Sequence, residues 1–361
     1  MHILLCNSSI TKNLPKVKGK ILQDYSTSGR KRPWRERKIQ SKLLAGTYLY
    51  LNKLTGIPDY KFKSIRVNEC GEYLKFKECP AGHREGQKLV SANFCRDRLC
   101  PLCQWRRAMK LAYQVNTVCH LALLEQPGLK FLFLTLTTKN VKAENLGAAI
   151  DQLNYAFKKL MKRKEVKQVV EGYFRAIEVT YNSTRDDYHP HIHAILAVKS
   201  GYFKGHNYIK YDRWVELWKQ ALKVNYSPIV HIERIKSRKK GDKPQIEQDN
   251  EEYMRAMSRA VAETAKYSVK PEDYISEDIE SVSNIVLTLS DALKGRRLIS
   301  YGGILLEMRK KLNMDDLEGE NVDLINITKE DEEEKCTCPI CNSNLIDIVY
   351  SWRIGLKEYI G

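Results

Sequence analysis

The chain has 361 residues and a net charge of +17, from 61 Lys or Arg and 44 Asp or Glu. The length leaves room for two or three domains, and the positive excess indicates a polyanionic partner, most simply nucleic acid. No apolar run reaches the roughly 18 residues of a membrane-spanning helix, so we expect no membrane partner. Ten cysteines without a recognisable secretion signal favour thiols and metal ligands over disulfides, and we expect a cytoplasmic protein.

The first 60 residues are predicted to be a basic N-terminal arm. Eleven Lys or Arg lie between residues 12 and 42, and five of them cluster around Trp34. Such a segment could track DNA phosphates as a flexible arm or could be a solvated tail, and the sequence favours neither. A short helix over residues 40–54 is compatible with both alternatives.

Residues 61–125 hold most of the cysteines and are predicted to bind zinc and contact DNA. Cys100 and Cys103 form a CxxC motif, whose turn can aim two thiolates at one zinc ion. We favour a structural zinc with four ligands: Cys79, Cys95, Cys100 and Cys103. Cys70 and His83 could replace one of these or belong to a second site. The alternative is a set of small buried cysteines without metal.

Basic residues at two places are candidate DNA contacts. Arg106, Arg107 and Lys110 directly follow the CxxC motif and begin a helical pattern, and basic residues on a helix braced by zinc are suited to contacts with the DNA backbone. Lys239 and Lys240 lie in a charged stretch without apolar periodicity, which predicts a loop. These two lysines could meet DNA or merely be solvated.

Apolar segments predict a set of neighbouring strands. Strands are expected at 131–138, 173–181 and 189–198, with an amphipathic helix over 144–164. The polar residues 182–187 would connect the last two strands. A hairpin there would place Glu178 opposite His191, because the midpoint of this pair falls within the connection.

The last of these strands carries His189, His191 and His193. Alternate side chains of a strand share a face, so the three imidazoles would lie together. Two imidazoles two residues apart on a stiff strand make a metal-binding pair, and Glu178 would add a carboxylate. His189 could replace a ligand or lie behind the ligands. The competing interpretations are half-buried histidines with ordinary hydrogen bonds and an exposed glutamate.

Residues 252–270 predict a long helix with three polar residues of interest, Glu263, Tyr267 and Lys270. Glu263 and Tyr267 are four residues apart, so on a helix both side chains could reach the same part of a substrate. Lys270 could bind a phosphate close to the phenol. Taken alone, a tyrosine on a helix is more often a core or surface residue than a nucleophile.

Residues 313–361 begin with an acidic stretch and end with a second cysteine knuckle. The acidic stretch is predicted to be a linker or solvated loop. Cys336, Cys338 and Cys341 follow it, and we take Cys338 and Cys341 as zinc ligands. The three cysteines could supply three ligands, and a fourth must come from elsewhere. Cys70 is one candidate and would join the two ends of the chain.

Four segments resemble, in this order, the motifs of a known family. They are FCRDRLCPLCQWRR (94–107), FLTLTTKN (133–140), YHPHIHAIL (188–196) and ETAKYSVK (263–270). Together they are similar to those of the rolling-circle plasmid replication initiators in the His-hydrophobic-His (HUH) endonuclease superfamily, in its single-tyrosine branch. The resemblance covers residues 70–275, and it leaves the N-terminal arm and the C-terminal tail uncovered.

The resemblance implies a metal-dependent, site-specific single-strand endonuclease and strand transferase. Its catalytic Mg²⁺ or Mn²⁺ would be held by Glu178, His191 and His193. Tyr267 would attack the scissile phosphate, leaving a 5′-phosphotyrosine and a free 3′-OH primer, with Lys270 supporting the phenolate. Glu263 would activate water for a second cleavage that terminates replication before strand joining.

We therefore expect an α+β fold with a central antiparallel sheet of about five strands flanked by helices. The expected parts are an arm (1–60), a zinc-binding DNA-contact segment (61–125), the HUH catalytic domain (126–312), and an acidic linker with a cysteine knuckle (313–361). The expected partners are origin DNA, as duplex and as a single-stranded hairpin, and a host helicase, since no Walker-type loop is present. A homodimer stays open.

Three other functions compete with this one. A transposase or a conjugative relaxase of the same superfamily would share the chemistry, although the cysteine-rich segment favours replication. A non-catalytic, zinc-containing DNA-binding regulator would explain the charge and the cysteines but not the histidines and the Glu-Tyr pair. An RNA-binding structural protein is the third alternative.

Overall fold

The computed structural model describes residues 19–26, 28–236, 246–266, 268–319, 321–329, 331 and 336–361, with backbone alone for 246–251. The helices are α1 (Trp34–Thr55), α2 (Pro58–Glu69), α3 (Pro101–Glu125), α4 (Leu146–Met161), α5 (Lys164–Val169), α6 (Tyr211–Leu222), α7 (Ile246–Thr264), α8 (Ile279–Leu293) and α9 (Ile304–Lys311). The strands are β1 (Tyr73–Glu78), β2 (Lys88–Ala92), β3 (Lys130–Thr137), β4 (Val170–Asn182), β5 (Asp187–Val198), β6 (Val230–Arg234), β7 (Ile299–Gly303), β8 (Ile346–Arg353) and β9 (Glu358–Ile360).

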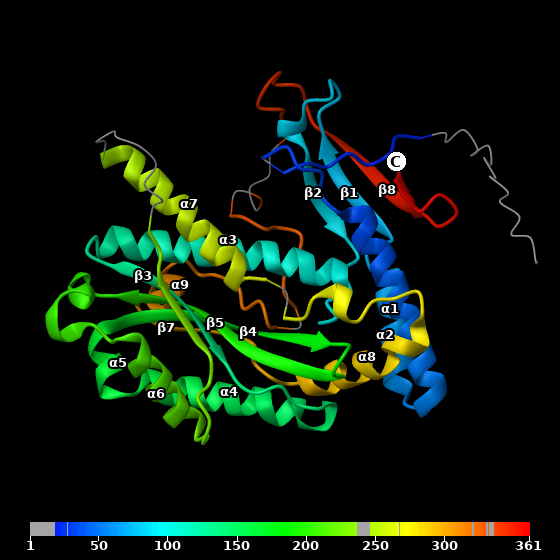
Figure 1. Ribbon diagram of the computed structural model, residues 1–361. Helices are drawn as coiled ribbons and strands as arrows, with labels where there is room; N and C mark the ends of the chain where they lie inside the picture. Colours follow the sequence, from blue (N-terminus) through cyan, green and yellow to red (C-terminus); the bar gives the residue numbers. More distant parts are fainter. Residues whose placement is uncertain are drawn as a thin grey trace, which may run out of the picture.

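A five-stranded antiparallel sheet forms the centre of the molecule, in the order β6-β3-β5-β4-β7. Helices α3 and α7 lie on one side of it, and α4 and α6 lie on the other (Figure 1). The expected α+β fold with a flanked central sheet is therefore confirmed. The buried stripe of α4, which includes Leu153 and Phe157, has the helical spacing that the sequence predicted.

The hairpin of β4 and β5 has the predicted register. Glu178 is paired with His191, and Ala176 is paired with His193. Side chains at paired positions point to the same face of a sheet. Arg175, on the other face, lies over the ring of Phe157 in α4. The histidines therefore face away from α4, toward the layer of α3 and α7.

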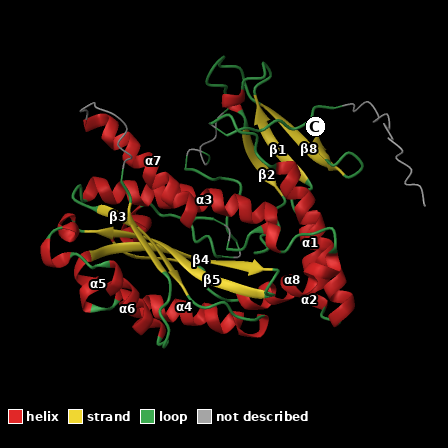
Figure 2. Cartoon of the chain, viewed as in Figure 1, coloured by secondary structure: helices red, strands yellow, loops and turns green. Residues whose placement is uncertain are grey.

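A second, four-stranded sheet has the order β2-β1-β8-β9 and was not predicted. It joins segments from both ends of the sequence, since β8 pairs along the whole of β1. Figure 2 shows it set apart from the central sheet. Tyr350 of β8 donates a hydrogen bond of 2.7 Å to the buried Glu78 of β1. Residues 20–22 continue the pairing by hydrogen bonds with residues 359 and 361.

The second half of the expected basic arm is a buried helix. Helix α1 begins at Trp34, which is 2% exposed and packs against Phe76, Phe94 and Trp105. Lys38, one of the clustered basic residues, is fully buried and donates to backbone carbonyls of residues 68 and 70. The prediction of a basic arm is therefore wrong for residues 34–55, because apolar side chains of this helix enter the core. Among the described residues, no helix combines the length and apolar character that a bilayer crossing needs.

Candidate functional site

Three ligand atoms from β4 and β5 converge on one point. The Nε2 atoms of His191 and His193 are 3.1 Å apart, and the Oε2 atom of Glu178 lies 3.6 Å from the first and 3.3 Å from the second. Neighbouring ligands of an octahedral ion with bonds of about 2.1 Å are about 3.0 Å apart. The three atoms are therefore spaced as one face of such a coordination shell, which leaves the opposite face for water or substrate oxygens.

Hydrogen bonds to the other ring nitrogens orient both imidazoles. The Nδ1 atom of His191 lies 3.1 Å from the carbonyl oxygen of residue 189, which can only accept, so this nitrogen donates and Nε2 is the nitrogen that faces Glu178 and His193. The Nδ1 atom of His193 lies 3.0 Å from the Oγ1 of Thr135 in β3. His189 is not in the triad: it bonds to Asn140 at 2.9 Å and stacks on His191. Its position behind the ligands was one of the two predicted alternatives.

Glu178 is buried, with 6% of its surface exposed. Burial by itself raises the pKa of this carboxyl, but the hydrogen bonds and positive charge of His191 and His193 outweigh it and hold the pKa well below its usual range. The carboxylate is therefore ionised, as a metal ligand must be. Lys270 contributes a further positive charge, with its Nζ 3.8 Å from Glu178 Oε1.

The segment after α7 differs from the predicted helix over 252–270. Helix α7 ends at Thr264, and the carbonyl of Ser268 accepts a hydrogen bond of 2.8 Å from the backbone N–H of Val179 in β4. Val269 forms a parallel bridge to Val179. Two causes are visible: this pairing with the edge of β4, and Pro271, which disfavours helical geometry at residue 270.

Tyr267 lies outside the described residues. Glu263 is in the last turn of α7, and its Oε2 is 2.5 Å from the Nζ of Lys266. The triad does not include Glu263. The expectation that Glu263 and Tyr267 share a continuous helix is corrected by the end of α7 at Thr264. Because Ser268 pairs with the neighbour of Glu178, the chain immediately after residue 267 lies beside the triad.

Four cysteines at the start of α3 form the first cluster: Cys70, Cys95, Cys100 and Cys103. Their sulfurs are 3.5 to 3.7 Å apart where they touch. Four thiolates around zinc, with bonds of about 2.3 Å, have edges of about 3.8 Å. The backbone N–H groups of residues 95 and 96 point at Cys70 and Cys103 at 3.3 and 3.2 Å, which suits negatively charged sulfur.

Cys79 belongs to a second cluster, so the prediction that it shares a zinc ion with Cys95, Cys100 and Cys103 is wrong. This cluster consists of Cys79, His83, Cys338 and Cys341, with Cys79 Sγ 3.5 Å from Cys341 Sγ. Pairing of β1 with β8 brings these residues together across the sequence. Hydrogen bonding with Ser343 lowers the pKa of Cys341 to about 6, which favours the thiolate that zinc needs. The alternative partner Cys70 is not part of this cluster.

The alternative that His83 belongs to a second site is the one that the structure supports, and the sequence carries the signal for this grouping. Cys79 and His83 frame a Pro-Ala-Gly turn, and Cys338 and Cys341 frame a Pro-Ile turn, so each pair is a knuckle that supplies two ligands. Two knuckles complete one tetrahedral site. Cys336 is exposed and is outside both clusters.

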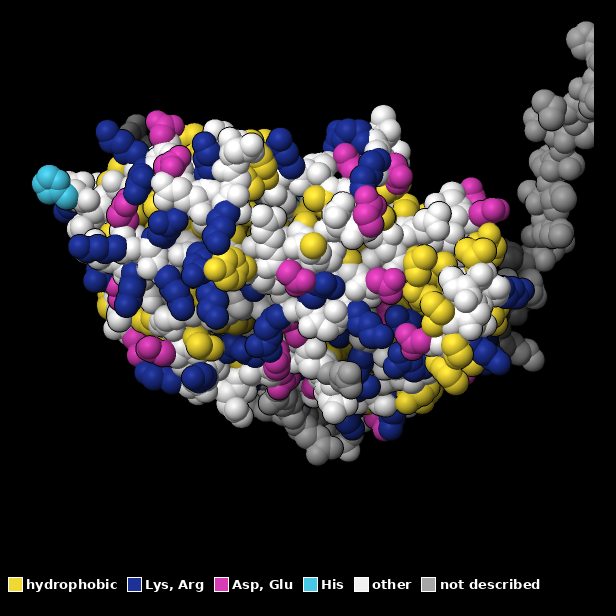
Figure 3. All heavy atoms as spheres, turned by 90° about the horizontal axis from the view of Figure 1, so that it is seen from below, with side chains coloured by type: hydrophobic (Ala, Val, Ile, Leu, Met, Phe, Trp, Pro, Cys, Tyr) yellow, Lys and Arg dark blue, Asp and Glu magenta, His cyan; other side chains and the backbone are white. Residues whose placement is uncertain are grey.

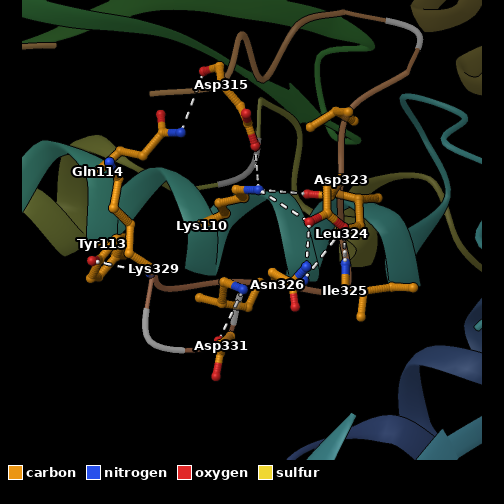
Figure 4. Close-up of polar contacts among 12 residues, drawn as sticks. Lys110, Tyr113, Gln114, Asp315, Asp323, Leu324, Ile325, Asn326, Lys329 and Asp331 are labelled. Atoms are coloured by element: carbon orange, nitrogen blue, oxygen red, sulfur yellow. Dashed lines mark hydrogen bonds and ion pairs between the residues drawn. The ribbon is translucent and has the colours of Figure 1, made fainter. Parts of the chain in front are cut away.

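Two predicted DNA contacts on α3 are buried instead. Arg106 is 1% exposed and donates to the carbonyls of Leu324 and Ile325 at 2.8 and 2.6 Å. Lys110 is 4% exposed and forms ion pairs with Asp315 and Asp323 (Figure 4). The described residues between 315 and 325 of the stretch expected to be a solvated linker thus lie along α3, because buried cations require partners. The prediction of DNA contacts is corrected for both residues.

The other predicted DNA contacts stand differently. Arg107 is partly exposed, and its Nε has no hydrogen-bond partner among the described residues. Lys239 and Lys240 lie outside the described residues.

The view from below shows further Lys and Arg side chains gathered over the region of α4, α5 and α6 (Figure 3).

Comparison with known proteins identifies the family. The family described as "Replication protein" matches residues 86–360, a range that includes the triad and the residues from Cys95 to Cys103. The chain belongs to this family of plasmid replication initiators. The predicted resemblance is confirmed at this level.

Curated relatives of this replication initiator cover nearly its whole length. A "Protein rep" of Bacillus amyloliquefaciens is 44% identical over 342 residues, which are 94% of this chain and 97% of the relative. A "Protein rep" of Streptococcus pneumoniae is 38% identical, over 94% of this chain and 95% of the relative. A "Replication protein" of Staphylococcus aureus is 34% identical, over 70% of this chain and 98% of the relative. No solved structure gives a significant match.

Proposed function

We propose that this replication initiator nicks one strand of its origin DNA and becomes covalently joined to that strand through Tyr267. The observation that carries the proposal is the convergence of Glu178, His191 and His193 on one point, next to the segment that contains residue 267. A divalent ion held by these three residues, Mg²⁺ or Mn²⁺, would polarise the scissile phosphate and stabilise its developing negative charge.

The phenol of Tyr267 is the proposed nucleophile. Its oxygen attacks the phosphorus, the bond from phosphorus to the 3′ oxygen breaks, and the strand ends as a 5′-phosphotyrosine and a 3′-OH primer. An unperturbed phenol has a pKa near 10, so a neighbouring cation is needed to favour the phenolate at neutral pH. Lys270 supplies such a cation beside Glu178, with about half of its side chain exposed.

Tyr274 is the other tyrosine close to this segment, and it is not suited to the role. It is fully buried, and its hydroxyl donates a hydrogen bond of 2.6 Å to the carbonyl of Leu99. Burial also raises the pKa of this phenol well above its usual value. A single nucleophile therefore requires another group to end replication.

We propose that Glu263 activates a water molecule for that terminating cleavage. The carboxylate lies in the last turn of α7, four residues before position 267. It forms an ion pair with Lys266, which directly precedes that position. Glu263→Gln keeps the size of the side chain but cannot take a proton. This variant should form the tyrosine adduct at the normal rate and terminate poorly, and an equal loss of both steps would contradict the role.

Structural zinc at the two cysteine clusters completes the proposal. The first cluster would fix the start of α3, and the second would join the C-terminal knuckle to β1. Elemental analysis of the purified chain should find two zinc ions. The four-part division of the chain, the host helicase and the homodimer stay predictions.

A covalent adduct tests the nicking proposal directly. Wild-type protein is incubated with labelled single-stranded origin DNA and Mn²⁺, and a denaturing gel separates free from protein-linked DNA. Tyr267→Phe should abolish the adduct, because only the nucleophilic oxygen is removed. Tyr155→Phe makes the same change at an exposed tyrosine of α4 and should leave the adduct intact. An adduct that persists in Tyr267→Phe would overturn the assignment.

A further inference from the structure

A hollow of about 920 Å³ borders β4 near the triad and is lined by apolar residues as well as by polar and basic ones. Its lining includes nine Lys or Arg and four Asp or Glu. It reaches the catalytic sheet at Ala176, which is paired with His193, and at Lys266 and Ser268, which flank residue 267. The hollow therefore borders the strand that carries Glu178 and the residues on either side of position 267.

The acidic residues of the hollow are already committed to partners. Asp59 forms an ion pair with Lys63 at 3.5 Å. Asp316 and Glu318 both pair with Arg297, at 2.5 and 3.2 Å. Asp97 accepts hydrogen bonds from Tyr48 and from a backbone N–H. Because these carboxylates already have partners, the surplus positive charge of the hollow lies on the other basic residues.

Five basic residues of the lining form no ion pair with a carboxylate among the residues that the structure describes. Arg96 and Arg98 donate to backbone carbonyls of other segments, and the other three are Arg66, Arg107 and Lys294. Arg66 and Lys294 are exposed at the rim of the hollow, and Arg107 is partly exposed, with a backbone carbonyl as the partner of one of its nitrogens. They come from α2, from the end of α8 and from α3. Cations that converge from separate elements and form no direct ion pair with a carboxylate are suited to a phosphate chain.

The first cysteine cluster shapes one wall of this hollow. Residues 95–98 line the hollow, beginning with Cys95 itself. Arg96 adopts a left-handed backbone conformation, and its backbone N–H points at the sulfur of Cys103. Arg98 donates to the carbonyls of Leu293 and Arg296, which ties this loop to the end of α8. The wall is thus fixed from both sides, by the cysteine cluster and by the helix end.

We infer that this hollow holds the single-stranded DNA next to the scissile phosphate, with Arg66, Arg107 and Lys294 contacting its backbone. The inference rests on the proposed nicking function and adds the path of the substrate to it. The basic surface over α4, α5 and α6 is the rival location, since Lys164 and Lys167 are also exposed there.

Charge reversal at exposed positions separates the two locations. Arg66→Glu/Lys294→Glu changes the hollow, and Lys164→Glu/Lys167→Glu makes the same change of charge on α5. Binding of fluorescein-labelled oligo(dT) is measured by anisotropy over a range of salt concentrations, without added divalent ion. Each lost phosphate contact lowers the salt slope of log K by about 0.7, so the hollow variant should lose about 1.4 and bind at least about tenfold more weakly.

The α5 variant should bind like wild type. Equal weakening in both variants, weakening in the α5 variant alone, or no weakening in either would overturn the inference. Thermal unfolding checks that both variants fold, and Arg66→Gln/Lys294→Gln replaces the first if it does not. Adduct formation by wild type is scored separately. Its absence would refute the nicking proposal, whereas normal adduct formation with unchanged binding in the hollow variant would refute the path alone.

Discussion

The triad of Glu178, His191 and His193 and the second cysteine cluster differ in how far apart their residues lie along the chain. Glu178, His191 and His193 come from two strands joined by a short connection. Cys79 and Cys341 are 262 residues apart and meet only because β1 pairs with β8. A site inside one hairpin can be inferred from strand periodicity, whereas a site between distant segments depends on the path of the whole chain.

The largest effect is expected at the triad. His191→Ala removes one of three ligands and should lower the rate of metal-stimulated cleavage by about 10²–10³-fold, since it removes stabilisation of the developing charge. Binding of DNA and the zinc content should stay as in wild type. His231→Ala, at an exposed histidine of β6, is the matched control. An equal loss of DNA binding would show that the histidines are structural.

Removing a ligand of the second cluster should affect stability and not chemistry. Cys338→Ser should lose one zinc ion and lower the unfolding free energy by about 3 kcal/mol, a part of the about 10 kcal/mol that a structural zinc contributes. Denaturant unfolding and elemental analysis measure both quantities. Cys336→Ser, two residues away and outside the cluster, should change neither. A drop in the rate of adduct formation at saturating DNA would contradict the claim that the second cluster affects stability alone.

A smaller effect is expected behind the triad. Thr135→Val removes the hydroxyl that bonds His193 Nδ1 and keeps the shape of the side chain. Partners of this kind change metal affinity by about 10–100-fold, so the Mn²⁺ needed for half-maximal cleavage should rise about tenfold. Thr184→Val, at an exposed position between β4 and β5, serves as the control. An unchanged Mn²⁺ requirement would show that this hydrogen bond does not orient the imidazole.

The smallest effect is expected in the second sheet. Tyr350→Phe removes a hydrogen bond to the buried Glu78, which keeps Lys20 and Gln87 as partners. The unfolding free energy should fall by about 1 kcal/mol, the usual value of one such bond. Tyr73→Phe, at an exposed position of β1, should leave the stability unchanged. A loss as large as that of Cys338→Ser would mean that this bond, and not zinc, holds the two ends together.

Several elements were within reach of sequence reasoning because their signals are local. The central strands, the stripe of α4 and the register between Glu178 and His191 each follow from a short period of apolar residues and the position of a turn. The end of α7 was predicted six residues too late. Its apolar spacing continues to Val269, but pairing of Val269 with β4 overrides that spacing.

The basic segments show the opposite case. Lys38, Arg106 and Lys110 were predicted to be surface residues because charged side chains usually are, and Trp34 was assigned to the same basic arm as Lys38. Each is buried against a segment that the sequence does not identify as its partner: Trp34 against β1 and α3, and Lys110 against the acidic residues 315 and 323. Charge alone does not distinguish a cation that faces DNA from one that faces a carboxylate of the same chain.

The sequence by itself determined three strands of the central sheet (β3, β4 and β5), the histidine pair with its carboxylate, and the resemblance to replication initiators, because these depend on residues close together in the chain. Strands β6 and β7 were not predicted. Only the tertiary structure decided which cysteines share an ion, which lysines are covered, and where a basic hollow opens beside the triad. Those features arise when distant segments pack together, and the free energy of such contacts depends on neighbours that no local pattern specifies.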